Sequence, residues 1–85
     1  MNYVYVLLSK VDKKFYTGAT SNLKSRVQKH IDGLVPSTSK RRPLKLIYYE
    51  ACISKEDAFR REKYLKTGMG KRYLRSRLKS SLEKL

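Results

Sequence analysis

The sequence predicts a small α/β domain, a three-stranded antiparallel sheet flanked by three helices. One observation is an almost wholly apolar run at residues 3–8, which is typical of a buried central strand. A second is that residues 15–18 and 44–50 combine β-branched and aromatic side chains in short runs, as strands do. The third is a helical spacing of apolar residues in three other segments. With 85 residues, the chain has the size of one domain, spanning residues 1–85.

The first two strands are predicted to form a hairpin. Side chains alternate across a strand, so Tyr3, Tyr5 and Leu7 share one face. Residues 10–14 are polar and form a connection of a length usual for hairpins. The chain then returns antiparallel, which should bring Tyr16 near Tyr5 on the same face. Aromatic packing alone would explain such a pair, but the helix that follows favours a functional role.

The first helix is predicted from Asn22, which is preceded by further candidate caps. Its apolar stripe consists of residues spaced by three and four: Leu23, Val27, Ile31 and Leu34. The helix is expected to end near Asp32, with Gly33 at the C′ position.

Two polar residues of this helix are candidates for chemistry. On a helical wheel Arg26 and His30 lie at one edge of the apolar stripe, one turn apart, where their side chains are neighbours. Gly18 ends the preceding strand, close to Tyr16. A tyrosine, a strand-ending glycine and an Arg/His pair beside a buried face form a cluster suited to phosphate chemistry.

An irregular segment and a third strand follow the first helix. The segment, residues 34–43, ends in a basic run of Lys40, Arg41 and Arg42. Basic residues in such a loop are candidates for phosphate contact, although a solvated charge run is an equal alternative. In the strand, Leu44, Leu46 and Tyr48 should alternate with Lys45, Ile47 and Tyr49.

The second helix is predicted to begin after Ser54 and to end at Gly68. Its apolar face is expected to consist of Ala58, Phe59 and Leu65, with Glu62 in the middle of that face. An ionised carboxylate among core residues is costly unless it has a partner. The partner could be Arg26, a lysine, or a divalent metal ion.

A turn at residues 69–70 should lead into a third helix, residues 71–85. Its leucines fall on one side and pack on the sheet, while the other side is basic and includes Lys71 and Arg72. That basic side is free to contact a nucleic-acid backbone.

Composition narrows the class of partner. The 21 Lys and Arg against 7 Asp and Glu give a formal net charge of +14. A charge of this size favours nucleic acid over a generic basic surface or an acidic protein partner. The lone Cys52 excludes an internal disulfide and suits a reducing compartment. No apolar run approaches the ~20 residues that span a bilayer, and the N-terminus lacks the form of a signal peptide, so we expect a cytoplasmic protein without membrane contact.

The order of these motifs resembles the GIY-YIG nuclease family, in particular its small, single-domain bacterial members. Tyr3-Val4-Tyr5 stands where the family has Gly-Ile-Tyr, and Tyr16-Thr17-Gly18 stands where it has Tyr-Ile-Gly. Arg26 and His30 match the family's Arg and His on the next helix, and Glu62 matches its later glutamate. The resemblance runs over about residues 2–78 and rests on five elements in the right order.

The resemblance implies a divalent-metal-dependent endonuclease that hydrolyses phosphodiester bonds, with DNA as the expected substrate. Glu62 would bind one Mg²⁺ or Mn²⁺ ion, and Arg26 would neutralise charge on the phosphate. Tyr5 or Tyr16 would deprotonate or orient the attacking water, with His30 as its partner. A base role needs nearby cations to lower the tyrosine pKa from its ordinary value of about 10.

The chain also departs from the family pattern. Tyr3 occupies the position of the family's first glycine, and Ser21 stands where several members have lysine, so that Lys24 is the nearest substitute. The asparagine that many members use late in the domain has no counterpart, because the only asparagines are Asn2 and Asn22. The alternative is therefore a nucleic-acid binding module with the nuclease fold and little catalysis. Under either reading, a protein partner could supply specificity.

Overall fold

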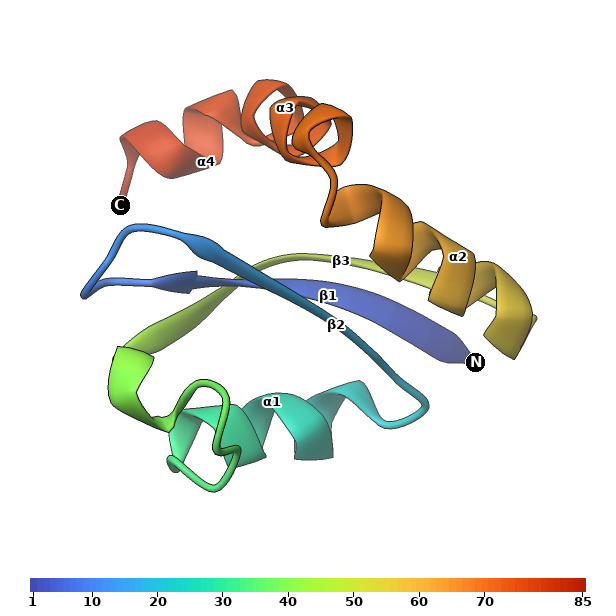
Figure 1. The fold of residues 1–85 in the computed structure, drawn as a ribbon, viewed down its shortest axis with the longest axis horizontal. Helices are drawn as coiled ribbons and strands as arrows, with labels where there is room; N and C mark the ends of the chain where they lie inside the picture. The colour runs from blue at the N-terminus through green and yellow to red at the C-terminus, as the bar shows by residue number, and fades with distance from the viewer.

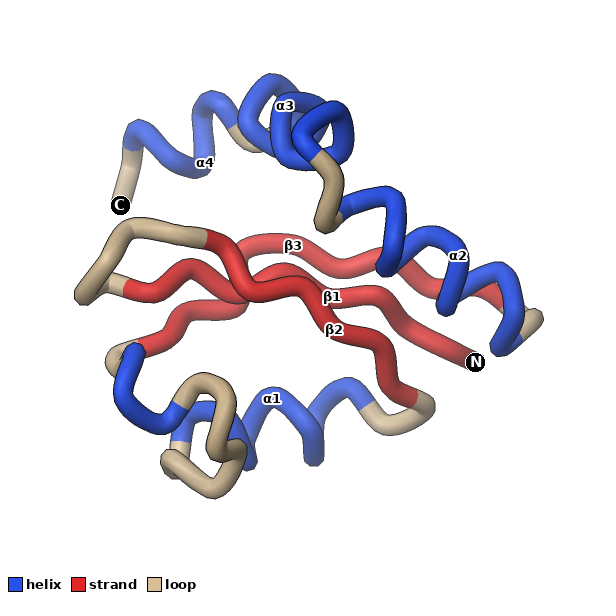
Figure 2. Tube along the Cα trace, viewed as in Figure 1, coloured by secondary structure: helices blue, strands red, loops and turns tan.

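The computed structural model describes all 85 residues. The elements follow in the order β1 (Asn2–Ser9), β2 (Phe15–Thr20), α1 (Leu23–Ile31), η1 (Ser39–Arg41, a 3₁₀ turn), β3 (Leu44–Cys52), α2 (Lys55–Leu65), α3 (Gly68–Arg77) and α4 (Lys79–Glu83). The three strands form one antiparallel sheet in the order β2-β1-β3. One face is covered by α1 and the other by α2, α3 and α4 (Figures 1 and 2). The predicted fold class is confirmed.

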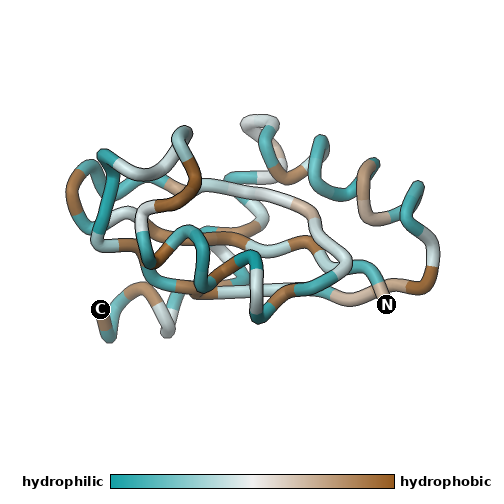
Figure 3. The backbone as a smooth tube through the Cα atoms, turned by 90° about the horizontal axis from the view of Figure 1, so that it is seen from below, coloured by the Kyte–Doolittle hydropathy of each residue, from teal (hydrophilic) through white to brown (hydrophobic).

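The central strand β1 separates two apolar cores. Its alternation is as predicted, because Tyr5 and Leu7 pack with Val27 of α1, whereas Val4 and Val6 pack under α2 and α3. Each helix therefore needs one apolar side only, and hydrophilic and hydrophobic residues interchange along the helical turns in Figure 3. None of the helices is long and apolar enough to cross a membrane.

A β-bulge changes the predicted alternation of the third strand. Val6 pairs with Tyr48, but the next residue, Leu7, pairs with Leu46, which leaves Ile47 as the extra residue. Ile47 and Tyr48 both pack on the core beneath α2 and α3, while Leu46 packs on the α1 side. The expectation that Leu46 and Tyr48 share a face was therefore wrong.

The buried face of α1 also differs from the prediction. The helix ends at Ile31, and Gly33 then takes a φ of +78°, as expected of a C′ glycine. Because the helix stops there, Ile31 is 45% exposed and Leu34 is 69% exposed. The residue that continues the stripe from Val27 is His30, which is 0% exposed. His30 thus lies in the middle of the buried face and not at its edge.

The junction between α2 and α3 falls earlier than predicted. The α2 helix ends at Leu65, and Thr67 caps α3 by accepting a hydrogen bond from the backbone N–H of Gly70. Gly68 therefore begins a helix instead of ending one, and residues 69–70 are helical. A Cβ on Gly70 would lie 2.5 Å from the Cα of Leu65, so the two helices approach too closely there for any side chain.

Two further details of the helices correct the sequence reading. Phe59 is 54% exposed and does not belong to the apolar face of α2, which is formed by Ala58 and Leu65. The predicted third helix is divided into α3 and α4 at Leu78. Leu74 and Leu78 are buried and Leu82 packs against the same core, so the predicted leucine face holds across the break.

Candidate active site

The site is built on the pairing of β1 with β2, which places Tyr5 directly opposite Gly18. The ring of Tyr5 extends across the glycine, because a Cβ on Gly18 would lie 2.5 Å from Cζ of Tyr5 and closer still to its hydroxyl oxygen. Gly18 is therefore required by a close approach of a side chain. With 1% of its surface exposed, Tyr5 belongs to the core on the α1 side of the sheet.

The hydroxyl of Tyr5 meets the imidazole of His30. Tyr5 Oη lies 2.8 Å from Nε2, and Nδ1 of the same ring lies 2.7 Å from Oγ1 of Thr38. The Thr38 hydroxyl donates to the carbonyl of Val35 at 3.5 Å, so its oxygen accepts from Nδ1–H of His30. Nε2 then accepts a hydrogen bond from the hydroxyl of Tyr5. All three side chains are buried, and the chain of hydrogen bonds defines the tautomer of His30.

Burial controls the protonation of both groups. Desolvation, helped by the positive charge of Arg26, lowers the pKa of His30, which keeps the imidazole neutral. Desolvation also raises the pKa of Tyr5, although a hydrogen bond from Arg26 acts in the opposite direction. The cations of the site therefore do not lower the Tyr5 pKa below its ordinary value, as a base role for this residue would require.

Tyr16 occupies a different environment from Tyr5. It lies on the edge strand β2, is half-buried, and its ring centroid is 5.1 Å from that of His30. Its hydroxyl accepts a hydrogen bond from Oγ of Ser37 at 3.4 Å. Of the two tyrosines, Tyr16 is therefore the one that reaches solvent.

Arg26 and Glu62 supply opposite charges to the site. The positive charge of Arg26 acts on Tyr5, and no carboxylate oxygen lies within 4.0 Å of the Arg26 guanidinium, so the expected alternative of an Arg26–Glu62 pair is not formed. The negative charge of Glu62 raises the Tyr5 pKa, which means that Glu62 lies within electrostatic range of the hydroxyl. Its carboxylate pairs with Nζ of Lys66 at 3.0 Å.

The surroundings of Glu62 are compatible with a divalent cation. Its side chain is 15% exposed and lines a hollow of about 370 Å³ together with Thr20, Ser21 and Asn2, which bear oxygen atoms. No group of three or more His, Cys, Asp or Glu residues gathers anywhere in the chain. A single carboxylate suits Mg²⁺, which keeps several waters and is commonly held by one or two carboxylates and substrate phosphates.

Comparison with known proteins identifies the family of the chain. The family model described as the GIY-YIG catalytic domain matches residues 1–76. The chain belongs to the GIY-YIG family. Within it, the chain is 45% identical to a UPF0213 protein of Clostridium perfringens over 67 residues, which is 78% of this chain and 71% of the relative. A UPF0213 protein of Staphylococcus haemolyticus is 42% identical, with 78% and 80% covered.

A solved structure extends the similarity to three dimensions. The solution NMR structure of the UPF0213 protein BH0048 from Bacillus halodurans is 39% identical and superimposes with a TM-score of 0.56. The match covers 89% of this chain and 84% of the other. The predicted resemblance to small bacterial GIY-YIG proteins is therefore confirmed.

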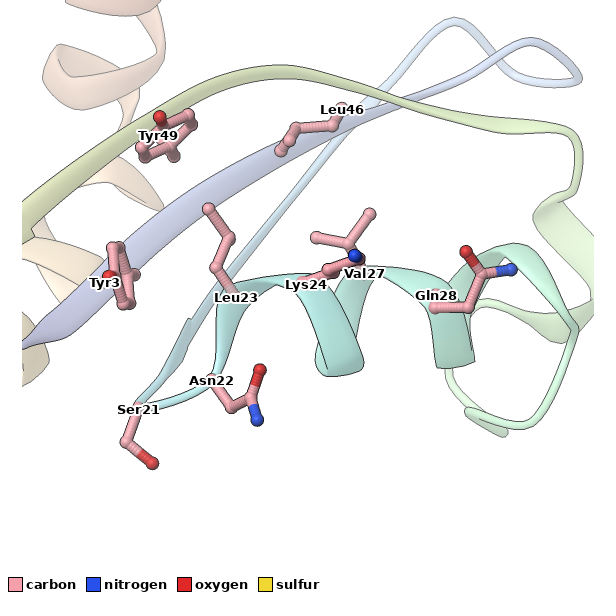
Figure 4. A pocket seen from close by; sticks show the side chains of 9 residues that line it. All are labelled: Tyr3, Ser21, Asn22, Leu23, Lys24, Val27, Gln28, Leu46 and Tyr49. Carbon is pink, nitrogen blue, oxygen red and sulfur yellow. The ribbon is translucent and has the colours of Figure 1, made fainter.

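Lys24, expected to replace a lysine of the GIY-YIG pattern, lines a different hollow. This hollow of about 550 Å³ lies between α1 and the strands β1 and β3. Tyr3 of β1 and Tyr49 of β3 form its aromatic wall (Figure 4). The two rings pack edge to face, with 6.3 Å between their centroids. Lys24 does not line the hollow beside Glu62, so it does not replace the missing GIY-YIG lysine there.

The other basic residues predicted to contact nucleic acid differ in whether their side chains already have partners within the protein. Lys40 is exposed, whereas Arg41 pairs with Asp12 at 2.9 Å and Arg42 donates to the carbonyl of Ser39 at 3.0 Å. Lys71 and Arg72 are exposed on α3, without a carboxylate partner. Their contact with nucleic acid stays a prediction.

Sequence reasoning missed two hydroxyl residues that contact the site, whereas the partner of Glu62 is a lysine, which was one of the expected alternatives. Thr38 bonds the far nitrogen of His30, Ser37 bonds Tyr16, and Lys66 pairs with Glu62. The Lys66 pairing had a usable signal, because Glu62 and Lys66 stand at i and i+4 on one helix. The two hydroxyl residues lie in a stretch that the sequence marks only as irregular, so their partners could not be read from it.

Proposed function

We propose that this GIY-YIG domain is a divalent-metal-dependent nuclease that hydrolyses phosphodiester bonds of nucleic acid, DNA first among its substrates. The observation that carries the proposal is that Tyr16, Arg26 and His30 lie around Tyr5, with Glu62 of α2 within electrostatic range of the Tyr5 hydroxyl. The formal net charge of +14 supports a polyanionic substrate. The lone Cys52 supports a place in the reducing cytoplasm.

Arg26 is the proposed phosphate-binding residue. Its guanidinium has no carboxylate partner, so it is free to donate to the non-bridging oxygens of a phosphodiester. As the phosphate gains negative charge in the transition state, the fixed positive charge of Arg26 becomes more favourable, which is the condition for catalysis by electrostatic stabilisation.

The two tyrosines are assigned different roles. Tyr16 reaches solvent, so its hydroxyl is available to orient the attacking water. Tyr5 is buried and its pKa is raised, so it stays protonated and donates to His30. The hydrogen bonds that His30 makes with Tyr5 and Thr38 hold the imidazole in one orientation, and the imidazole packs against the Tyr16 ring. Tyr5 and His30 are therefore positioning residues for Tyr16.

Glu62 is the residue that would hold the cation. A Mg²⁺ or Mn²⁺ ion at this carboxylate would supply positive charge to the phosphate and to the leaving oxygen. Lys66 neutralises the carboxylate when no cation is bound, and its side chain is 54% exposed, so it can turn away into solvent. Glu62 would then exchange one positive partner for another.

The Lys66–Glu62 pair also favours the second candidate function, a binding module without catalysis. In that case the glutamate needs no metal ion, because the lysine already neutralises it. The test is cleavage of single-stranded DNA, duplex DNA, branched DNA and RNA, with and without Mg²⁺ or Mn²⁺, by the parent and by Arg26→Ala. Metal-dependent products from the parent alone support the nuclease. Salt-sensitive binding without products from any substrate supports the binding module.

A further inference from the structure

A basic hollow lies away from the active site. It has a volume of about 410 Å³ and is lined by five residues from three separate segments, namely Lys14, Phe15, Arg41, Lys71 and Arg75. Four of the five are cations, and no acid is among them. The β1–β2 turn and η1, which contribute to it, lie at the same end of the sheet (Figure 1).

The cations of this hollow are poorly compensated. Only Arg41 has a carboxylate partner, Asp12, and the hydrogen bond from Arg41 lowers the pKa of that carboxyl to about 2. Lys14, Lys71 and Arg75 have no carboxylate within 4.0 Å. Lys71 and Arg75 also stand one helical turn apart, where like charges repel. An anion placed among these side chains would relieve that repulsion.

Two of the cations are held in place by the fold. The guanidinium of Arg75 lies over the ring of Phe15, with Cζ 4.8 Å from the ring centroid. Arg41 is held by Asp12 at 2.9 Å and by the carbonyl of Lys14 at 3.3 Å, while its own carbonyl accepts from the buried Ser9 hydroxyl at 2.7 Å. Guanidinium groups fixed in this way match the geometry of phosphate oxygens and lose little freedom on binding.

The position of the hollow relates it to the active site. Lys14 and Phe15 directly precede Tyr16, so the edge strand β2 runs from the hollow to the glycine beneath Tyr5. Gly18 is four residue steps beyond Lys14, which is about 13 Å along a strand that rises ~3.3 Å per residue. A nucleic-acid strand that binds along this edge with one phosphate at the active site also places neighbouring phosphates along β2.

We infer that this hollow binds a backbone phosphate of the same nucleic-acid strand that enters the active site. The inference rests on the proposed function only in taking nucleic acid as the ligand. It adds Lys14 to the residues predicted to contact nucleic acid, and it gives Arg41, Lys71 and Arg75 a common ligand. The chemistry recognised is a phosphate group, either in a backbone or free in solution.

The test compares two double variants of the full chain that lose the same charge. Lys71→Gln with Arg75→Gln removes two cations from the hollow. The matched control, Lys79→Gln with Lys84→Gln, removes two exposed cations that neither line the hollow nor have a carboxylate partner. Affinity for a labelled DNA duplex is measured over a range of salt concentrations, and thermal melting checks that each variant is folded.

The slope of log affinity against log salt should become shallower by about 0.9 units in the hollow variant, because one phosphate contact is lost and each such contact contributes ~0.9 units. The control should change the slope by less than half as much, and a single Arg75→Lys variant should keep the parent slope. Equal changes in both double variants would overturn the inference, because the hollow would then be no more than part of a positive surface.

Inorganic phosphate distinguishes the two sources of the ligand. If the hollow takes any phosphate, titration should shift the amide NMR signals of Lys14 and Phe15 in the parent but not in the hollow variant. Unshifted signals together with the expected slope difference mean that only a backbone phosphate binds. A slope difference without cleavage would refute the proposed nuclease but support phosphate binding by the hollow. Cleavage with equal slopes would support the nuclease but refute phosphate binding by the hollow.

Discussion

Replacement of Gly18 by alanine should destabilise the fold through Tyr5. The added Cβ would lie 2.5 Å from Cζ of Tyr5, well inside van der Waals contact, and the ring cannot move into solvent because Tyr5 is 1% exposed. Overpacking of a core costs about 1–3 kcal/mol. Displacing the ring also breaks its bond to Nε2 of His30, and a buried group left without its partner costs about 1–3 kcal/mol more. We therefore expect a loss of about 2–6 kcal/mol.

The chain offers a matched control in Gly68. No heavy atom lies within 4 Å of a Cβ built on this residue, and it lies at the start of α3 without a positive φ. Gly68→Ala should therefore raise the free energy of unfolding by about 0.4–1 kcal/mol, because the alanine restricts the unfolded chain. Both values come from urea denaturation followed by far-UV circular dichroism.

Tyr5→Phe separates the two parts of the Gly18 effect. The phenylalanine keeps the ring but leaves Nε2 of His30 unpaired, so it should cost about 1–3 kcal/mol by itself. Gly18→Ala should cost less in this background, because the hydrogen bond is already absent. A Gly18→Ala protein as stable as the parent would refute the reasoning, because the ring would then not need the space above residue 18.

Three further predictions concern charge. Arg26→Ala should abolish cleavage and leave the melting temperature within a few degrees of the parent, because the guanidinium has no ion-pair partner to lose. Glu62→Gln should abolish metal-dependent cleavage in the same assay but change stability by less than about 1 kcal/mol, because its partner Lys66 is 54% exposed. Protonated His30 is disfavoured in the folded state, so its lowered pKa contributes stability that is present above its ordinary value of about 6.5 and is lost as the pH falls through the folded value. Urea midpoints should thus fall between pH 7.5 and pH 5.5 in the parent, while a flat profile would contradict the burial of a neutral imidazole.

The helices and strands could be predicted where one local signal dominated. Asn22 and Ser54 cap α1 and α2 as expected, since each accepts a hydrogen bond from the backbone three residues on. At Gly68 two local signals competed, a C′ glycine for one helix and a Thr67 cap for the next. The contact that decides between them, the approach of Gly70 to Leu65, depends on the packing of two helices. Local rules cannot supply it.

The site residues could be named from motif order, but their partners could not. Thr38 reaches His30 because residues 34–43 fold back over the end of α1, and nothing in that segment specifies such a path. The same limit applies to Arg41, which looks like a free basic residue in the sequence. Its partner Asp12 is 29 residues away, in the β1–β2 turn. Partners of this kind depend on tertiary contacts between segments distant in sequence.

The clearest gain from the structure is the difference between Tyr5 and Tyr16, which the motif presents as equivalent. Strand order is the physical reason, because β1 has a neighbour on each side and β2 is an edge. A side chain at the centre of a covered sheet is desolvated, so the pKa of Tyr5 rises and its proton stays on the hydroxyl. The edge leaves Tyr16 within reach of water. The two substitutions by phenylalanine should therefore have different effects. Tyr16→Phe should lower kcat and leave the stability unchanged, whereas Tyr5→Phe should lower both kcat and the stability.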